Sequence, residues 1–363
     1  MSMSTIFLLV ILLLGFLITF QIAKASEYVG VLKGEKKNFE QNNKVNGFLM
    51  IAFLVLGLIG VYYCNELYRG KILGESGSVH GEQIDTMLYI TLAITGVVFF
   101  ITQILLFWFA YKYQYSEKRQ AHYFPHDNRL EVIWTVIPAI ALTVLVGFGL
   151  FYWFKITGEA PKDSMQVEVT GRQFGWIFRY PGKDQVFGKK YYKNITDAGQ
   201  NSLGLIWDDP NTHDDIVTGE MYIEVNKPVK LLINSRDVIH DVGLVDFRQK
   251  MDAVPGTPTT MWFIPRFTTD SMRKIKNNPE FEYEISCDQM CGKGHYTMRG
   301  IVKVVKHDEF VLWMAKQKAN YAMAFPDKDP NAQKQPIDTL PKNPAAAVIR
   351  TPTATSGLVA IKK

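Results

Sequence analysis

The stretch TMLYITLAITGVVFFITQILLFWFAY, residues 86–111, contains no charged side chain. A helix needs roughly 20 consecutive apolar residues to cross the hydrocarbon core of a lipid bilayer. This stretch exceeds that length, and a helix that is apolar on all sides must be buried in protein or in lipid. The stretch therefore predicts a transmembrane helix.

Three further stretches share this character, and no run of that length follows Lys155. They are residues 5–23, 45–63 and 132–154. Four such runs do not fit the core of a soluble protein. The sequence therefore predicts a membrane protein with four transmembrane helices.

The basic residues between these runs predict the orientation of the chain. Residues 24–44 hold five lysines and residues 112–131 hold four basic residues, whereas residues 64–85 hold only two. Basic loops stay on the cytoplasmic side of a membrane. The first and third loops are therefore expected in the cytoplasm. The chain after Lys155 is then expected on the outer, periplasmic face of a bacterial inner membrane.

The tripeptide Ala23-Lys24-Ala25 resembles the cleavage site of a signal peptide. However, the chain starts with MSMST, which lacks the basic segment of a signal peptide. Cleavage would also place the large C-terminal part in the cytoplasm, against the distribution of lysines. We therefore expect the first helix to be retained.

Beyond Lys155 the apolar residues alternate with period two in short segments separated by Gly, Pro and Asn turns. This pattern predicts β-strands, and together they predict an all-β sandwich or barrel over about residues 160–310. The candidate strands are 165–170, 221–225, 229–233, 260–264, 281–285 and 301–305.

The C-terminal part is expected to contain one short helix, 309–323, followed by an extended tail. From Pro326 the chain is rich in Pro, Ala, Thr and Lys and shows no periodicity. It contains no Cys-x-x-Cys-His motif, so no covalently bound c-type haem is expected.

Composition excludes several classes of protein. The formal net charge is only +5 and the basic residues are scattered, so no nucleic-acid partner is expected. The three cysteines do not make a disulfide framework.

Two of those cysteines lie together in CDQMCGKGHYTM, residues 287–298. A disulfide suits the oxidising side of a membrane, but it explains neither His295 nor Met298. Zinc makes no use of a thioether ligand. Thiolate, imidazole and a weak methionine sulfur are the ligands of copper electron-transfer sites. Copper is therefore the hypothesis that accounts for the whole segment.

A single copper of this kind needs one thiolate, so two neighbouring thiolates indicate a pair of bridged copper ions. Each ion would still need an imidazole. His240 ends the strand-like run 233–240 in the same β domain and is the candidate for the second imidazole. The remaining histidines are His80, His122, His126, His213 and His307.

The motif Cys-x3-Cys-Gly-x2-His-x2-Met, formed by Cys287, Cys291, Gly292, His295 and Met298, resembles the copper loop of subunit II of the haem–copper cytochrome c oxidases. Other segments resemble the same family over about residues 85–310. Residues 237–240 and 250–256 resemble the segment with its first copper histidine, 130–139 the start of its second membrane helix, and 171–176 its aromatic segment.

The resemblance implies a fold, a domain division and a ligand set. The β domain would be a cupredoxin-like Greek-key domain. The expected domains are 1–84 with two extra transmembrane helices, 85–158 with a helix hairpin, 159–310 with the copper A domain, and 311–363 with a C-terminal helix and tail. The implied ligands of two copper ions are His240, Cys287, Cys291, His295, Met298 and the backbone carbonyl of Gln289.

The resemblance also implies a subunit of a proton-translocating terminal oxidase. Copper A would accept electrons from a cytochrome c, or from a cytochrome c domain of a partner complex. It would pass them to haem in oxidase subunit I, where oxygen is reduced to water. Oxidase subunit I and other oxidase subunits would be partners within the membrane.

Two alternative functions come from other classes of protein. One is a copper-free subunit of a quinol oxidase, which the intact ligand set disfavours. The other is the copper A subunit of a nitrous-oxide or nitric-oxide reductase, which residues 130–139 disfavour.

Two positions depart from the pattern of many family members. Many family members have Glu at position 289, where it helps to bind a magnesium ion at the interface with subunit I. This chain has Gln289, whose neutral side chain is a poorer ligand for a hard cation. Many members also have Trp at position 174, where electrons enter from cytochrome c, whereas this chain has Phe174. Trp176 would belong to the same route, or would be a core aromatic residue of a strand.

Two acidic residues have one functional and one ordinary interpretation each. Glu131, at the start of the fourth helix, would lie at the mouth of a proton path, or would be a solvated carboxylate favoured by the helix dipole. Asp237 would help to dock the electron donor, or would be an acid in a turn.

Overall fold

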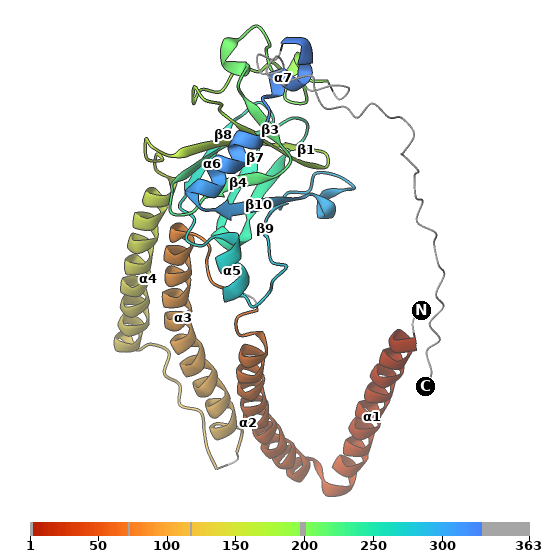
Figure 1. Ribbon diagram of the computed structural model, residues 1–363. Helices are drawn as coiled ribbons and strands as arrows, with labels where there is room; N and C mark the ends of the chain where they lie inside the picture. The colour runs from red at the N-terminus through yellow and green to blue at the C-terminus, as the bar shows by residue number, and fades with distance from the viewer. Residues whose placement is uncertain (1–2, 72, 117, 197–200, 329–363) are drawn as a thin grey trace. The chain divides into compact units, whose positions relative to one another are not determined.

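The computed structural model describes residues 3–71, 73–116, 118–196 and 201–328. Figure 1 shows its elements in chain order, with long helices first and a β-domain after them. Most of the extended tail expected after Pro326 lies outside the described residues.

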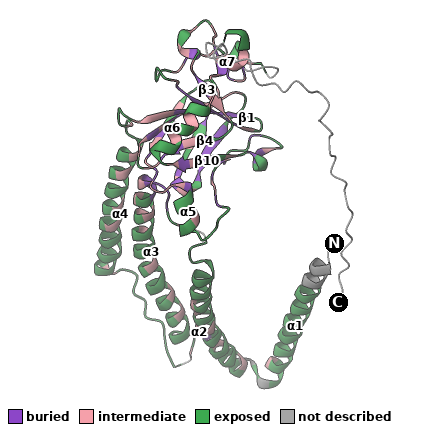
Figure 2. Cartoon of the chain, viewed as in Figure 1, coloured by how far each residue is buried: buried purple, intermediate pink, exposed green. Residues whose placement is uncertain are grey.

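Four long helices occur in the described part of the chain. They are α1 (Met3–Lys33), α2 (Glu35–Tyr68), α3 (Val79–Lys112) and α4 (Asn128–Thr157). Each is long and apolar enough to cross a membrane, which confirms the prediction of four transmembrane helices. Most of their described side chains are exposed, as Figure 2 shows in green. Because these exposed side chains are largely apolar, the helix surfaces suit lipid or other membrane helices rather than water.

Side-chain caps determine where α3 and α4 begin. The hydroxyl of Ser78 accepts a hydrogen bond from the backbone N–H of Gly81 at 2.9 Å. The carboxylate of Asp127 accepts from the N–H groups of Arg129 and Leu130, at 3.0 and 3.2 Å. These bonds satisfy N–H groups that have no partner within a helix. Both helices therefore start a few residues before their apolar runs.

Two five-stranded sheets form a β-sandwich from ten strands of the described chain. The sheet orders are β3-β2-β1-β5-β8 and β4-β10-β9-β6-β7, and most neighbouring strands are antiparallel, although β1 pairs with β5 and β10 with β4 in parallel. The strands are β1 (Met165–Arg172), β2 (Gly175–Tyr180), β3 (Ile216–Thr218), β4 (Met221–Glu224), β5 (Val229–Ser235), β6 (His240–Leu244), β7 (Gln249–Ala253), β8 (Thr259–Phe263), β9 (Tyr283–Cys287) and β10 (Arg299–Val305). The predicted fold class, four transmembrane helices followed by an all-β domain, is confirmed.

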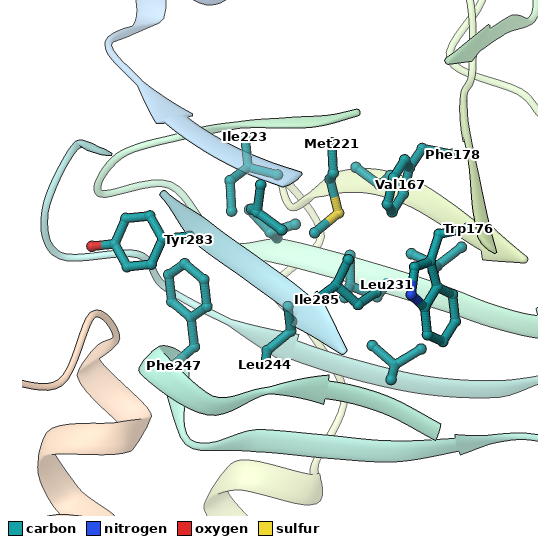
Figure 3. Packing of buried hydrophobic residues seen from close by; sticks show 14 of the residues in the cluster. Val167, Trp176, Phe178, Met221, Ile223, Leu231, Leu244, Phe247, Tyr283 and Ile285 are labelled. Carbon is teal, nitrogen blue, oxygen red and sulfur yellow. The ribbon is translucent and has the colours of Figure 1, made fainter. Parts of the chain in front are cut away.

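The core of the sandwich follows from the alternation of apolar residues. In β1, Val167 and Val169 are fully buried, and β5 contributes Leu231 and Ile233 in the same way. Figure 3 shows the side chains of both sheets meeting between the layers, with the ring of Phe247 beside that of Tyr283. Burying one such side chain contributes roughly 1.5–3 kcal/mol.

One strand boundary differs from the prediction. His240 does not end a continuous run from Ile233, because β5 ends at Ser235 and His240 begins β6. Between them, the side chain of Asp237 accepts a hydrogen bond from the N–H of Val238 at 2.7 Å. This short-range bond stabilises a turn where the sequence resembles a strand.

A segment that precedes α3 belongs to the sandwich as well. Ser76 and Ser78 are buried, and the backbone of Gly77 both donates to the carbonyl of Asp246 and accepts from the N–H of Arg266, each at 2.7 Å. Ser78 also forms a β-bridge with Pro265. Residues 76–78, here called the pre-α3 segment, therefore act as an added edge of the β-domain.

Side chains at the start of α3 strengthen this attachment. Arg248 Nε and Nη2 contact the two carboxylate oxygens of Asp85 at 2.9 and 3.1 Å. The ring of His80 lies edge-on to Trp262, and Trp262 Nε1 donates to the carbonyl of Gly158 beyond α4 at 2.9 Å.

The chain divides into two compact units. The first contains Met1–Pro181 and Ile216–Gln317, and the second contains Gly182–Asp215 and the residues from Lys318 on. In the second unit, the N–H of Asn320 donates to the carbonyl of Asp215 at 2.8 Å. The domain division at residues 84, 158 and 310 stays a prediction.

The single helix predicted at 309–323 is wrong, because the structure has two helices there. They are α6 (His307–Lys316) and α7 (Asn320–Ala324). In the first unit, Trp313 of α6 stacks on Tyr222, whereas in the second unit Tyr321 of α7 packs against Trp207. Helix propensity determines structure only weakly, and here the different packing partners of the two helices override it. A seven-residue helix, α5 (Thr269–Ile275), precedes β9.

Candidate metal centre

The cysteine-containing segment connects two adjacent strands at one end of the sandwich. Cys287 is the last residue of β9, and β10 begins at Arg299. The N–H of Cys287 donates to the carbonyl of Met298 at 3.2 Å, which closes the loop at its base. Gly292 has a φ of 134°, a conformation that favours glycine. The loop between β9 and β10, residues 288–298, is here called the cysteine loop.

The loop brings both sulfur atoms next to two imidazoles. Cys287 Sγ and Cys291 Sγ lie 3.8 Å apart. Cys287 Sγ lies 3.8 Å from Nδ1 of His240, and Cys291 Sγ lies 3.7 Å from Nδ1 of His295. Met298 Sδ is 3.8 Å from Cys291 Sγ. All five side chains are buried, so the atoms face one another away from solvent.

Gln289 contributes a backbone atom to the same cluster. Its carbonyl oxygen lies 3.1 Å from Cys287 Sγ, and residue 289 itself is exposed. The side chain is therefore not required in order to place the carbonyl oxygen among the sulfur and nitrogen atoms.

His240 reaches the cluster from another strand of the same sheet. It begins β6, and Val242, two residues further along this strand, pairs with Cys287 of β9. Its Nε2 lies 2.8 Å from the carboxylate of Asp237. Gly171 of β1 leaves room for the ring, because a Cβ at that position would lie only 2.8 Å from His240 Cδ2.

The donor set fits copper. The cysteines are free thiols rather than a disulfide, and one ligand atom each of His240, Cys287 and Cys291 lies within 4.8 Å of the others. Burial, together with the adjacent Cys287, raises the pKa of Cys291 to about 11. A thiolate at neutral pH therefore needs a cation at this place. Soft sulfur and imidazole donors select copper over hard cations.

Phe174 and Trp176 lie close together at the β1–β2 turn but differ in exposure to solvent. Phe174 is 44% exposed and rests on the cysteine loop, where a Cβ on Gly294 would lie 2.5 Å from its ring. Trp176 is buried, with its ring centroid 6.2 Å from that of His240. Phe174 therefore presents an aromatic surface to solvent, whereas Trp176 packs in the core beside a candidate ligand.

Asp237 is not a free surface acid. Its carboxylate accepts from the N–H of Gln173 at 2.8 Å as well as from Val238 and His240. Burial alone would raise the pKa of Asp237, but these hydrogen bonds outweigh it and lower the pKa below its ordinary value. The residue is thus an anion that holds neighbouring groups in place.

Glu131 and the remaining histidines lie outside the cluster. Glu131 is exposed in the first turn of α4. Nδ1 of His307 contacts Glu224, Nδ1 of His80 lies near the carbonyl of Trp262, and the ring of His213 packs at a tilt against that of Tyr321 in the second unit. His122 and His126 are exposed between α3 and α4.

Two residues near the cluster escape sequence reasoning. Gln173 Nε2 donates to the carbonyl of Cys291 at 2.5 Å, and Gly171 makes room for His240. Both lie beside Phe174 in the aromatic segment, and that proximity is the one signal that could have identified them.

Comparison with known proteins shows the family. The chain matches the family models for the transmembrane domain of cytochrome c oxidase subunit II over residues 73–151 and for its periplasmic domain over residues 165–305. It is 34% identical over 237 residues to the alternative cytochrome c oxidase subunit 2 of Bradyrhizobium diazoefficiens, covering 65% of this chain and 80% of that relative. The chain belongs to the cytochrome c oxidase subunit II family.

Further members of the family are more distant. Cytochrome c oxidase subunit 2 of Cereibacter sphaeroides is 25% identical over 238 residues, which cover 63% of this chain and 74% of that protein. The crystal structure of the periplasmic domain of subunit II of cytochrome oxidase from Bradyrhizobium japonicum is 25% identical, covers 46% of this chain and all of that domain, and has a TM-score of 0.31.

Membership in the subunit II family confirms several expectations. The chain is a subunit of a terminal oxidase, which is an oxidoreductase, and it is part of an oxidase complex in a membrane. Helices α1 and α2 end before residue 73, where the match to the transmembrane domain begins. They are the two extra N-terminal helices of this subunit.

Proposed function

We propose that this subunit receives electrons for the terminal oxidase through a binuclear copper A centre. One observation carries the proposal: two buried free thiols lie 3.8 Å apart, and each has a different imidazole Nδ1 within 3.8 Å. A single copper ion of the blue type uses one thiolate, whereas here there are two thiols and each has an imidazole of its own. The duplication supports two copper ions.

The residues divide into two groups about the cysteines. His240 and the carbonyl of Gln289 lie beside Cys287, and His295 and Met298 lie beside Cys291. These residues would hold two copper ions, which would supply one-electron acceptance and release with little structural reorganisation. The chain itself excludes water from the ligands and, through Asp237, directs Nδ1 of His240 toward Cys287.

The route of the electrons follows from this assignment. A cytochrome c, or a cytochrome c domain of a partner complex, would approach at Phe174, the exposed aromatic side chain that rests on the cysteine loop. The electrons would continue to haem in subunit I, where oxygen is reduced to water. Trp176 would support this route through its packing beside His240.

Further parts of the proposal concern the surroundings of the site. The same hypothesis includes a magnesium ion near Gln289 and a proton path that starts at Glu131. It also places the subunit in a bacterial inner membrane, with the β-sandwich in the periplasm. The lysines of residues 24–44, where α1 ends and α2 begins, support that orientation, as do the basic residues of 112–131, where α3 ends and α4 begins.

The decisive experiment combines metal analysis with activity. The purified oxidase complex should contain two copper atoms in this subunit, absorb in the near infrared, and consume oxygen with reduced cytochrome c. Cys287→Ser and His295→Ala should each abolish the near-infrared band. A normal band in either variant, or zinc in place of copper, contradicts the proposal.

A further inference from the structure

A pocket of about 820 Å³ lies where two membrane helices meet the β-domain. One wall comes from α3, α4 and the segment 158–160 that follows α4, and the other comes from β5, β7 and β8. All these elements belong to the first compact unit. Pockets that bind small molecules have volumes of roughly 300–1,000 Å³, and none of the proposed copper ligands lines this one. The pocket is therefore a candidate binding site apart from the metal centre.

The pocket spans the level at which both helices leave the hydrocarbon core. In α3 the uncharged run begins at Thr86, next to Met87 of the lining. In α4 it ends at Phe154, between Trp153 and Ile156 of the lining. Uncharged runs mark the part of a helix that lies in the hydrocarbon, and Trp side chains concentrate at the boundary with water. The pocket thus lies at the membrane surface nearest the β-domain.

Two side-chain contacts hold the walls of the pocket together. Trp262 of β8 donates through Nε1 to the carbonyl of Gly158, which follows α4, at 2.9 Å. Arg248, which precedes β7, contacts the carboxylate of Asp85 in α3 at 2.9 and 3.1 Å. The pocket is therefore formed before a ligand arrives, which lowers the cost of binding.

The two walls differ in polarity. The helix wall is mainly apolar and includes Met87 of α3 and both Gly149 and Trp153 of α4. The strand wall adds polar side chains, among them Lys230 of β5 and Gln249 of β7. A ligand that contacts both walls at the edge of a bilayer must be apolar toward the helices and polar toward the strands. Membrane lipids have this arrangement.

Gln249 offers a hydrogen-bond donor that the chain does not use. Its side chain is only 7% exposed, and its Nε2 has no hydrogen-bond partner among the residues that the structure describes. Buried polar groups almost always have a partner in the protein or in a bound molecule. The amide therefore indicates an acceptor inside the pocket.

Two charged residues of the lining are also unpaired. Lys230 is partly buried and Glu159 is exposed, and neither forms an ion pair within the described ranges. Lys250, the second lysine of the lining, lies 3.7 Å from the carboxylate of Asp241. Charges that leave water are normally paired, so Lys230 suits an anionic group of a ligand and Glu159 a cationic group.

We infer that the pocket binds a zwitterionic phospholipid from the surrounding membrane. Its phosphate would accept charge-assisted hydrogen bonds from Lys230 and from the amide of Gln249. Its ammonium group would face Glu159, and an acyl chain would lie along Met87 and Gly149. An anionic headgroup would match Lys230 but would meet like charge at Glu159. This site lies outside the proposed path of the electrons, so it does not depend on copper.

The first test counts lipids in the intact oxidase complex. After purification in detergent, mass spectrometry of the extracted lipids should find one phosphatidylethanolamine per complex fewer in Lys230→Met with Gln249→Leu than in the unmodified complex. Lys230→Met alone should lose part of this lipid, and it serves if the pair does not assemble. The matched control is Lys274→Met with Gln120→Leu, two exposed residues that do not line the pocket.

The second test concerns the headgroup. Phosphatidylethanolamine added to the delipidated complex should raise the melting temperature more than phosphatidylglycerol with the same acyl chains or inorganic phosphate, because a ligand of the folded state stabilises it. Glu159→Gln should remove the preference between the two lipids. Copper content and oxygen consumption should stay unchanged in every variant.

Three outcomes overturn the inference. The first is an equal lipid count in the unmodified complex and in Lys230→Met with Gln249→Leu. The second is stabilisation by phosphatidylglycerol that equals or exceeds that by phosphatidylethanolamine in the unmodified complex. The third is a side-chain-resolution map of the complex in which water alone, or a side chain of a neighbouring subunit, fills the pocket.

Discussion

Nε2 of His240 lies 2.8 Å from the Oδ1 atom of Asp237, and this contact decides which ring nitrogen faces the cysteines. Since Nε2 carries the proton that it donates to the carboxylate, Nδ1 keeps its lone pair. Nδ1 is also the atom that lies 3.8 Å from Cys287 Sγ. One carboxylate thus sets both the tautomer and the orientation of a proposed ligand.

Asp237→Ala should weaken copper binding without removing a ligand. The ring of His240 would lose the acceptor for Nε2–H, and outer partners of this kind typically contribute 10–100-fold in metal affinity. Dialysis of the purified complex against graded chelator concentrations, followed by copper analysis, measures the change. The control is Asp163→Ala, an exposed acid that precedes β1. Equal copper retention by Asp237→Ala and the unmodified complex contradicts the assigned role.

Gly171→Ala should displace His240 and deplete the centre of copper. A Cβ at Gly171 would lie 2.8 Å from Cδ2 and 3.1 Å from Cβ of His240, so the ring or the strand must shift. The matched control is Gly175→Ala on the other side of the same turn, because a Cβ there has no atom within 4 Å. The near-infrared absorption per subunit compares the two, and the idea fails if both variants keep the full band.

Glu224 should make the β-domain sensitive to acid. Burial alone would raise the pKa of Glu224, but Lys227 Nζ at 2.8 Å and His307 Nδ1 at 2.6 Å outweigh it and lower the pKa below its ordinary value. A carboxyl with a lowered pKa stabilises the fold at pH values above its unfolded pKa. This stability is lost as the pH falls through the folded pKa.

Glu224→Gln should therefore destabilise the protein at pH 7 by about 1–3 kcal/mol, and the difference should shrink in acid. Thermal unfolding of the purified protein between about pH 7 and about pH 2 measures it, because the lowered pKa of Glu224 lies in the acidic part of this range. Glu220→Gln, at an exposed glutamate four residues earlier, is the control. A difference between Glu224→Gln and the original protein that stays constant over this range argues against the proposed titration.

Phe247→Ala should cost about 3–5 kcal/mol of stability, because it leaves a cavity in the core. Its fully buried ring stacks on Tyr283 with centroids 4.5 Å apart and lies 4.8 Å from that of Phe263. Val245→Ala, at a residue that is 66% exposed, should change stability by less than about 0.5 kcal/mol. Denaturant unfolding of both variants checks the contrast, and similar midpoints would show that this ring is not an element of the core.

The membrane helices are predictable from the sequence because each has a long run without charge, and lipid imposes that requirement directly. Their ends are less predictable. Helix α2 begins at Glu35, ten residues before the apolar run that starts at Val45. Outside the bilayer, charged and polar residues can either continue a helix or form a loop. Composition therefore does not mark the end of the helix.

The strands also differ in how well the sequence predicts them. β5 alternates between buried and partly exposed residues, and the sequence shows it. β1 alternates apolar and polar residues in sequence, although Glu168 and Thr170 are buried as well. β6, the strand of His240, is buried at all five positions, and β2 is buried at five of its six. A strand that is covered on both faces need not alternate apolar and polar residues, and the sequences of these two strands do not, which is why both are absent from the prediction.

The candidate site shows a similar limit. The spacing within residues 287–298 predicts the cysteine loop, because its ligand types recur within a few residues. The bond from Gln173 to Cys291 spans 118 residues of sequence, and no local pattern indicates it. His240 is predicted because a second copper ion needs an imidazole from the same β domain, and the resemblance to a family supports that choice.

The pre-α3 segment has a practical consequence for anyone who excises the soluble half of this subunit. A fragment that starts after α4 contains every proposed ligand but loses Gly77, so the carbonyl of Asp246 and the N–H of Arg266 lose their backbone partners. Arg248 would also lose the carboxylate of Asp85. Such a fragment would have unpaired backbone groups along one edge of the β-domain, and its melting temperature should be lower. Residues 74–81, attached to its N-terminus through a flexible linker, should restore that melting temperature.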